Sequence, residues 1–201
     1  PQFRDKAGVR DPGVYATAEQ DPQGYWAEQA RQLHWDQPFS TVLDDANPPF
    51  YKWFPDGTLN ASYNCLDRHV QAGRGGRVAY HWRGEEGEER DITYADLHRD
   101  TQRLANGLKD LGVRRGDVVG IFLPMIPEVV VAMLACARIG APHNVIFGGF
   151  SPDSVYERLK VSHAKALITV DGARRKGRTA AIKGELDWVV SGLEDLRTVV
   201  V

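Results

Sequence analysis

The stretch that most constrains the fold of this chain is the apolar run from residue 117 to residue 150. The β-branched residues at 118–123 predict a strand that is covered on both faces. Pro127 predicts the first turn of a helix, where its missing N–H costs nothing, and Gly140 predicts the left-handed end of that helix. A second strand is expected at 141–147. This order predicts a βαβ unit with parallel strands, which usually bind ligands beyond their carboxyl ends.

The predicted helix between Pro127 and Gly140 is apolar on nearly every side, which favours a deeply buried position. Glu128 and Arg138 are the clear exceptions. We therefore expect both of these side chains to face solvent.

Two further apolar segments, at 166–170 and 197–201, predict strands that extend the same sheet. Ser151 can cap a helix that begins at Pro152 and continues to about residue 163. The fold class predicted from these segments is α/β, with a largely parallel central sheet and flanking helices.

A hairpin and a long helix are expected before the apolar run. Alternating residues at 78–83 and a return strand at 91–93 flank a charged turn whose glutamates should be solvated. Thr93 predicts the cap of an amphipathic helix at 94–111. The apolar face of this helix consists of Tyr94, Leu97, Thr101, Leu104, Ala105, Leu108 and Leu111.

The amino-terminal part of the chain is less regular. Residues 1–20 are polar and are expected on the surface or poorly ordered, and a helix is expected at 21–34. The segment 36–74 is rich in Pro, Asn, Asp and aromatic residues and predicts an irregular wrap over a larger body. We accordingly predict two parts: residues 1–76 with the helix and the wrap, and residues 77–201 with the first part of the α/β domain.

The run at 64–69 contains Cys65, Asp67 and His69, which are residue types used in nucleophilic catalysis. Because all three fall within one short, helical segment, they cannot easily converge as a nucleophile, a base and its orienting partner. The interpretation we favour is structural packing, and no catalytic or metal-binding residue is predicted.

Composition narrows the functional class. A net charge of −2 argues against recruitment of nucleic acid or membrane by the field of the whole chain. The two cysteines are too few for a disulfide framework and suit a reducing compartment, so a cytoplasmic location is expected. No signal peptide or membrane span is recognisable. The chain starts at Pro1 and ends in a valine triplet, and we expect it to be part of a longer protein.

Two segments that follow predicted strands are candidates for a ligand site. Gly148 and Gly149 follow the strand at 141–147, and four cations, Arg174, Arg175, Lys176 and Arg178, follow the strand at 166–170. A basic run is most often a solvated face, but both segments should open on the same edge of the sheet. Glycines allow close approach to backbone N–H groups, and the helix that begins at Pro152 would direct its positive end there. The combination predicts a site for a flexible, phosphate-bearing ligand.

An ordered series of motifs extends this prediction. These motifs are YWAEQA at Tyr25, WFPDGTLNASYNCLDRH at Trp53, ITYADL at Ile92, GDVVGIFLPMIPE at Gly116, ACARIGAPHNVIFGGFSP at Ala135 and LITVDGARRKGR at Leu167. With these motifs the chain resembles the N-terminal third of the acetyl-CoA synthetases, which are AMP-forming acyl-CoA ligases of the adenylate-forming superfamily. The resemblance covers nearly the whole chain beyond the first twenty or so residues.

The resemblance implies substrates and site residues. Members of this family convert acetate and ATP into an acyl-adenylate, and coenzyme A then displaces AMP. Their coenzyme A site uses an FGG segment, which corresponds to Phe147, Gly148 and Gly149 in this chain. It also uses an R-x-G-R pattern, which corresponds to Arg175, Lys176, Gly177 and Arg178, with Arg174 as an additional neighbouring cation.

Other parts of the family's machinery are missing from the printed sequence. The Ser/Thr/Gly-rich phosphate loop, the hinge aspartate and the C-terminal catalytic lysine are not found. We therefore expect the 201-residue chain to be inactive by itself, and the Mg²⁺ that the resemblance implies to be bound by residues outside it. Alternatives are a propionyl-CoA synthetase, a non-catalytic module that binds coenzyme A or a nucleotide, and a purely structural domain. The oligomeric state does not follow from the sequence.

Overall fold

The chain is described by a computed structural model, in which residues 5–175 and 177–201 are placed. It divides into two compact units, Pro1–Leu59 and Asn60–Val201. The predicted boundary between residues 76 and 77 stays a prediction. Within the described residues, no helix combines the length and the apolar character that a membrane crossing requires.

The first unit contains short elements joined by loops. These are α2 (Gly13–Gln20), α3 (Pro22–Arg31), β1 (Leu43–Asp44) and β2 (Lys52–Trp53), with β1 and β2 antiparallel. The α2 helix was not expected from the sequence, but none of its residues is buried, so the predicted surface position is confirmed over this helix. The helix predicted at 21–34 is confirmed as α3, and the Asp21 carboxylate caps it by accepting a hydrogen bond from Gly24 N at 2.9 Å.

Aromatic rings hold the loops of this unit together. The ring of Phe39 lies 5.1 Å from that of Trp35 and 4.6 Å from that of Phe54, and the indole of Trp35 donates to Ala30 O at 2.8 Å. The predicted turn at Asp56 is confirmed, because Gly57 N donates to Phe54 O at 3.1 Å. Aromatic packing therefore holds the loops between the short helices and strands of this unit.

The second unit begins with two π-helical turns, η1 (Tyr63–Asp67) and η2 (Val70–Arg74). The prediction of an irregular segment is wrong here. Asn60 caps the first turn, because its side-chain oxygen accepts a hydrogen bond from Tyr63 N at 3.0 Å. Gly73 interrupts the helical conformation with a φ of 74°. Whether the rest of the segment wraps over the sheet stays a prediction.

The predicted hairpin and long helix are confirmed as β3 (Val78–Arg83), β4 (Glu89–Thr93) and α4 (Tyr94–Asp110). Thr93 Oγ1 caps α4 by accepting a hydrogen bond from Asp96 N at 3.1 Å. On the predicted apolar face, Leu97, Thr101, Ala105 and Leu108 are buried. Leu111 is 53% exposed, because the helix ends before it.

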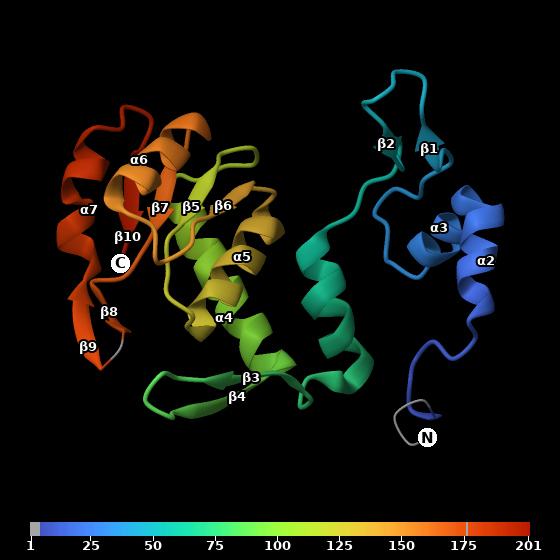
Figure 1. Cartoon of the computed structure of the whole chain (residues 1–201), viewed down its shortest axis with the longest axis horizontal. Coiled ribbons are helices and arrows are strands. Elements are labelled where there is room, and N and C mark those ends of the chain that lie inside the picture. The colour runs from blue at the N-terminus through green and yellow to red at the C-terminus, as the bar shows by residue number, and fades with distance from the viewer. Residues whose placement is uncertain (1–4, 176) are drawn as a thin grey trace. The chain divides into compact units, whose positions relative to one another are not determined.

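The central sheet is entirely parallel, as predicted, with the strand order β10-β7-β5-β6. Its strands are β5 (Val119–Ile121), β6 (His143–Val145), β7 (Ala166–Ile168) and β10 (Thr198–Val200). The helices that pack on it are α4, α5 (Pro127–Ile139), α6 (Pro152–Val161) and α7 (Ile182–Ser191). Figure 1 shows the sheet between these helices. The α7 helix was not expected from the sequence.

Each face of the sheet is covered by its own apolar cluster. Val119, Ile121 and Ile168 pack with α4 and α5 in one cluster. Leu167 packs with α6 and α7 in the other. This alternation along β5 and β7 follows the pleat of a strand, in which successive side chains point to opposite faces. The central sheet is therefore the middle layer of a three-layer arrangement, covered on both sides as the apolar run predicts.

The α5 helix has the predicted ends. Pro127 occupies its first turn, and Gly140 follows it with a φ of 71°. The prediction that Arg138 faces solvent is wrong, because its guanidinium forms an ion pair with the buried carboxylate of Asp67. Glu128 is exposed, as predicted.

Candidate functional site

The glycine pair lies in a tight turn at the end of β6. Phe150 N closes this turn by donating a hydrogen bond to Phe147 O at 3.0 Å. A Cβ on Gly149 would lie 2.6 Å from a ring carbon of Phe147, and a Cβ on Gly148 would lie 3.2 Å from the backbone oxygen of Leu123. Close approach therefore favours glycine at Gly148, where the neighbour is backbone, whereas the neighbour of Gly149 is a side chain. The ring of Phe147 is left 65% exposed at the carboxyl edge of the sheet.

The α6 helix begins directly after this turn. Ser151 Oγ accepts a hydrogen bond from Ser154 N at 3.4 Å, and Pro152 occupies the first helical turn, as predicted. The free N–H groups at this helix start carry partial positive charge, which attracts anions. The start of α6 thus adds electropositive character beside the exposed Phe147.

Arg158 is a site residue that the sequence reasoning missed. It lies on α6, and its guanidinium carbon is 4.2 Å from the ring centroid of Phe150. The two rings of the turn, Phe147 and Phe150, meet edge to face at 5.7 Å. A cation over an aromatic face is electrostatically favourable, so Arg158 supports the turn and adds positive charge next to it. The signal in the sequence that could have identified Arg158 is its spacing, because it follows the Ser151 cap by seven residues, or two helical turns.

The basic run is part of an antiparallel hairpin, which the sequence reasoning did not expect. Its strands are β8 (Gly172–Arg175) and β9 (Arg178–Ala181). Arg175 and Arg178 are partners in the register next to the turn. Gly177 has a φ of 69°, a conformation that favours glycine directly before β9.

The individual basic residues of this hairpin differ in their surroundings. Arg178 and Gly177 are exposed. Arg174 is also exposed, and its guanidinium forms an ion pair with the Glu86 carboxylate from the turn between β3 and β4. Lys176 and the side chain of Arg175 lie outside the described residues.

The sheet order brings the two predicted segments to the same edge but not to adjacent strands. The turn at Phe147 follows β6 and the hairpin follows β7, while β5 lies between these strands. Strands in a sheet are about 4.8 Å apart, so the ends of β6 and β7 are separated by roughly 10 Å. An extended ligand could contact both segments.

A cavity of about 470 Å³ also opens at this edge, between the β3–β4 turn and the start of β8. Among the described residues, its lining includes Arg174, Met125 and Val170, but neither Gly148 nor Arg178. Trp82 supports its wall by donating a hydrogen bond from Nε1 to Met125 O at 2.8 Å. Of the predicted site residues, Arg174 therefore lines this cavity, whereas Gly148 and Arg178 lie outside its lining.

The residues of the 64–69 run have separate roles. The Asp67 carboxylate accepts two hydrogen bonds from Arg138, which hold its pKa below the ordinary value of 3.8. The ring of His69 instead contacts Arg74, with 2.8 Å between Nδ1 and Nη2, and burial lowers its pKa. Cys65 is exposed. This arrangement agrees with the structural interpretation of the run. Within residues 5–175 and 177–201, no cluster of His, Cys, Asp and Glu is arranged to hold a metal ion.

Comparison with known families decides the assignment. Residues 66–199 match the family model described as AMP-binding enzyme, and residues 13–65 match the model described as Acetyl-coenzyme A synthetase N-terminus. The chain belongs to the AMP-binding enzyme family. Both segments of the candidate site fall within the first match, and the resemblance to acetyl-CoA synthetases is confirmed.

Curated relatives of the chain are named acetyl-coenzyme A synthetase. An acetyl-coenzyme A synthetase of Streptomyces avermitilis is 54% identical over 188 residues, which are 94% of this chain and 29% of the relative. That of Rubrobacter xylanophilus is 49% identical over 201 residues, which are 100% of this chain and 31% of the relative. That of Mycobacterium tuberculosis H37Rv is 49% identical over 194 residues, with shares of 96% and 30%. The chain therefore spans less than a third of the length of these relatives.

Proposed function

We propose that this chain is the amino-terminal portion of an AMP-forming acetate–CoA ligase and that it contributes part of the coenzyme A site. In this reaction the acetate carboxylate attacks the α-phosphorus of ATP, and pyrophosphate leaves. The thiol of coenzyme A then attacks the carbonyl carbon of the acetyl-adenylate, and AMP leaves. Substrates are acetate, ATP and coenzyme A. The Mg²⁺ expected with ATP would be bound by residues outside this chain.

The observation that carries the proposal is the location of both predicted segments at the carboxyl edge of one parallel sheet. Ligands of such sheets bind at this edge. Coenzyme A carries a 3′-phosphate and a pyrophosphate, and it is long enough to contact two segments that are separated by a strand. Arg178 is exposed in the hairpin, and the electropositive start of α6 follows the turn at Phe147.

Within this proposed site, Phe147 and the arginines have different tasks. The exposed ring of Phe147 offers an apolar face against which an adenine base can stack. Guanidinium groups at Arg175 and Arg178 can bind phosphate oxygens through paired hydrogen bonds. Arg174 contributes less, because Glu86 already neutralises its charge.

Steady-state kinetics of the complete ligase test the proposal. Replacing Arg175 or Arg178 by Ala should raise the KM for coenzyme A roughly 10- to 150-fold, since each charge-assisted hydrogen bond contributes about 1.5–3 kcal/mol. Acetate-dependent exchange of pyrophosphate with ATP should stay nearly unchanged, because that step precedes coenzyme A entry. Lysine at either position should rescue only partly, because it lacks the guanidinium fork.

Arg174→Ala is the matched control, since this residue lies in the same strand as Arg175 but is paired with Glu86. Dephospho-CoA provides a second control. The variant that has lost the 3′-phosphate contact should barely distinguish it from coenzyme A. If both arginine variants keep a normal KM for coenzyme A while pyrophosphate exchange falls, the hairpin serves ATP or folding, and the site assignment is wrong.

Simple assays distinguish the proposed function from two alternatives. A propionyl-CoA synthetase would show a higher kcat/KM for propionate than for acetate. A non-catalytic module would bind coenzyme A or a nucleotide without forming acetyl-adenylate. The 201-residue chain alone should show no pyrophosphate exchange, because its sequence lacks the phosphate loop and the catalytic lysine of the family. Pyrophosphate exchange by the purified 201-residue chain would contradict the expectation that this activity needs the phosphate loop and the catalytic lysine.

A further inference from the structure

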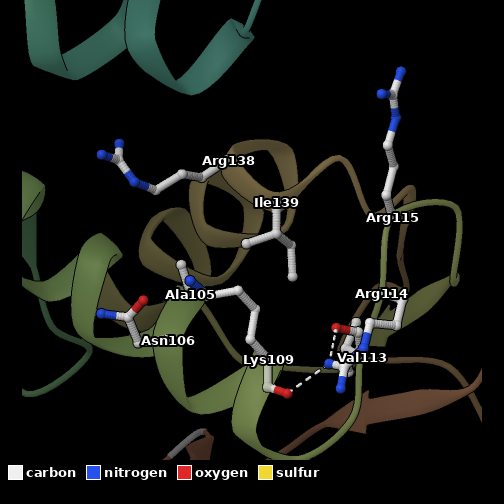
Figure 2. Close-up of a pocket in the computed structure, with 8 residues that line it drawn as sticks. All are labelled: Ala105, Asn106, Lys109, Val113, Arg114, Arg115, Arg138 and Ile139. Atoms are coloured by element: carbon white, nitrogen blue, oxygen red, sulfur yellow. Dashed lines mark hydrogen bonds between the residues drawn. The ribbon is translucent and has the colours of Figure 1, made fainter.

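A second pocket lies at the opposite edge of the sheet from the proposed coenzyme A site. It is formed by the carboxyl-terminal turns of α4 and α5 together with the loop that enters β5 (Figure 2). Its volume of about 520 Å³ falls within the range of small-molecule sites, roughly 300–1,000 Å³. Nothing in the adenylation or thioester step proposed above uses this pocket.

The lining of this pocket is cationic at the rim and apolar at the base. Its charged residues are Lys109, Arg114, Arg115 and Arg138, and among the described residues no carboxylate lines it. Its apolar residues are Ala105, Val113 and Ile139. A surface of this kind favours an anion that also carries an apolar part.

Two of the four cations have structural partners. Arg138 is held by the carboxylate of Asp67. Arg114 donates hydrogen bonds from Nη1 to Lys109 O at 2.7 Å and to Val113 O at 3.2 Å, so its charge stabilises the carboxyl-terminal end of α4. These two contacts explain why Arg114 and Arg138 are present without any ligand.

Lys109 lies in the last turn of α4, where the helix dipole favours a cation, and for Arg115 no such structural reason is found among the described residues. Within residues 5–175 and 177–201, neither side chain takes part in an ion pair. The stem of Arg115 lies close to the end of α5, because its Cγ is 3.0 Å from the place where a Cβ on Gly140 would sit. Gly140 is thus required both for its positive φ and for the room that it gives to Arg115.

Figure 2 shows how these side chains surround the pocket. Ile139 projects into its middle and Lys109 extends along one side, while Arg115 extends upward and away from Ile139. A ligand lying over Ile139 would therefore lie beside Lys109 and would be reached by Arg115 once that side chain turns toward it. Long, exposed Lys and Arg side chains can turn toward such a ligand at a modest cost in conformational entropy.

We propose that this pocket binds a small phosphate-bearing anion, with Lys109 and Arg115 as its charged contacts and Ile139 beneath its apolar part. The shared chemistry is a phosphate group, which either inorganic phosphate or a small organic phosphate supplies. The proposal is independent of the coenzyme A site, because the two lie at opposite edges of the sheet.

Isothermal titration calorimetry of the complete protein tests the site, with inorganic phosphate and phenyl phosphate as probes at low ionic strength. Both should bind saturably, and the double variant Lys109→Ala/Arg115→Ala should weaken binding by at least about tenfold, as expected for lost hydrogen bonds to charged groups. If the apolar base of the pocket contributes to binding, phenyl phosphate should bind more tightly than inorganic phosphate. If inorganic phosphate is the ligand, the two probes should bind equally tightly. Added salt should weaken both.

Two control variants separate this pocket from other basic surfaces. Arg103→Ala removes an exposed cation from the same helix outside the lining and should leave binding unchanged. Arg178→Ala, in the hairpin at the opposite edge, should leave unchanged the binding that depends on Lys109 and Arg115. Arg115→Lys keeps the charge and should retain part of the affinity. The proposal is overturned if neither probe binds saturably, if the double variant binds normally, or if binding disappears in Arg178→Ala instead.

Discussion

Arg138 and Asp67 form a bidentate ion pair, in which Nη1 and Nη2 of the arginine donate hydrogen bonds of 2.7 and 2.8 Å to the two carboxylate oxygens. His98 adds a third contact, with 3.0 Å between its Nε2 and the same carboxylate. The side chains of Asp67 and Arg138 are only 10% and 26% exposed. The pair therefore fastens the π-helical turn η1 to the carboxyl-terminal end of α5.

Removing one partner of this pair should destabilise the protein, because the other charge is left half-buried. We expect Asp67→Asn or Arg138→Met to lower the free energy of unfolding by about 2–4 kcal/mol, somewhat less than for a fully buried pair. The double variant should cost less than the sum of the two single changes. Urea denaturation measures these values. As a control, Arg99→Ala removes an exposed pair with Asp96 and should change stability little.

The same pair predicts a pH dependence. Because the hydrogen bonds from Arg138 lower the pKa of Asp67 in the fold, the unfolded chain binds more protons than the folded chain at acidic pH. The contribution of the pair is present above the ordinary pKa of 3.8 and is lost as the pH falls through the lower, folded value. The stability difference between the wild type and Arg138→Met should therefore shrink as the pH falls below about 4.

Urea denaturation at a series of pH values checks this expectation. The pKa values of Asp56 and Asp195 are also lowered, to about 2 in each case, so the wild type loses stability in acid for several reasons. Those carboxylates are present in both proteins, and the difference between the two curves isolates Asp67. Parallel curves down to the lowest pH would show that the ion pair does not set the pKa of Asp67.

Local signals in the sequence were sufficient to predict the parallel sheet. The apolar strands, Pro127 at the start of α5 and Gly140 at its end each act within a few residues, and the structure follows them. The α7 helix was not predicted, although Ile182, Leu186 and Val189 recur at helical spacing. The cations that precede it are typical of a loop, and the whole segment was therefore interpreted as one. The β8–β9 hairpin was missed for the same reason.

Contacts between distant residues could not be predicted. Arg138 was expected in solvent because its partner, Asp67, lies 71 residues earlier in the chain. The ion pair between Arg174 and Glu86 likewise joins two separate hairpins, and a basic run alone does not reveal which of its cations is already neutralised. For the candidate site, the sequence could identify the segments and their common edge, whereas the intervening strand β5 became visible only in the sheet order.

The two cysteines should differ sharply in reactivity. Cys136 is buried in the core between α5 and the sheet, and burial raises the pKa of its thiol to about 12. Cys65 is exposed. Titration of the native protein with a disulfide reagent should label Cys65 alone, and labelling in denaturant should reach both thiols. Cys65→Ser should abolish the native reaction, and rapid native labelling of that variant would show that the core around Cys136 opens readily.

Gly120 in β5 should be required for the packing of α6 on the sheet. A Cβ at this position would lie 2.3 Å from Cδ2 of Leu159 and 3.3 Å from Cδ1 of Leu167. Both leucines are fully buried, so neither can move into solvent. We expect Gly120→Ala to lower the free energy of unfolding by about 1–3 kcal/mol, the usual cost of overpacking a core. Gly107→Ala in α4 is the matched control, because a Cβ there meets nothing within 4 Å.

The control substitution should raise stability by about 0.5–1 kcal/mol, since alanine favours a helix interior over glycine. A second substitution identifies the clash. Leu159→Val shortens the side chain that approaches Gly120, and its own cost comes from the lost methylene and the space that it leaves. If overpacking against Leu159 causes the defect of Gly120→Ala, the alanine fills that space, and the double variant should be more stable than the sum of the two single changes predicts. Additive costs in urea denaturation would instead indicate that Leu159 moves aside and that the strain lies elsewhere in the strand.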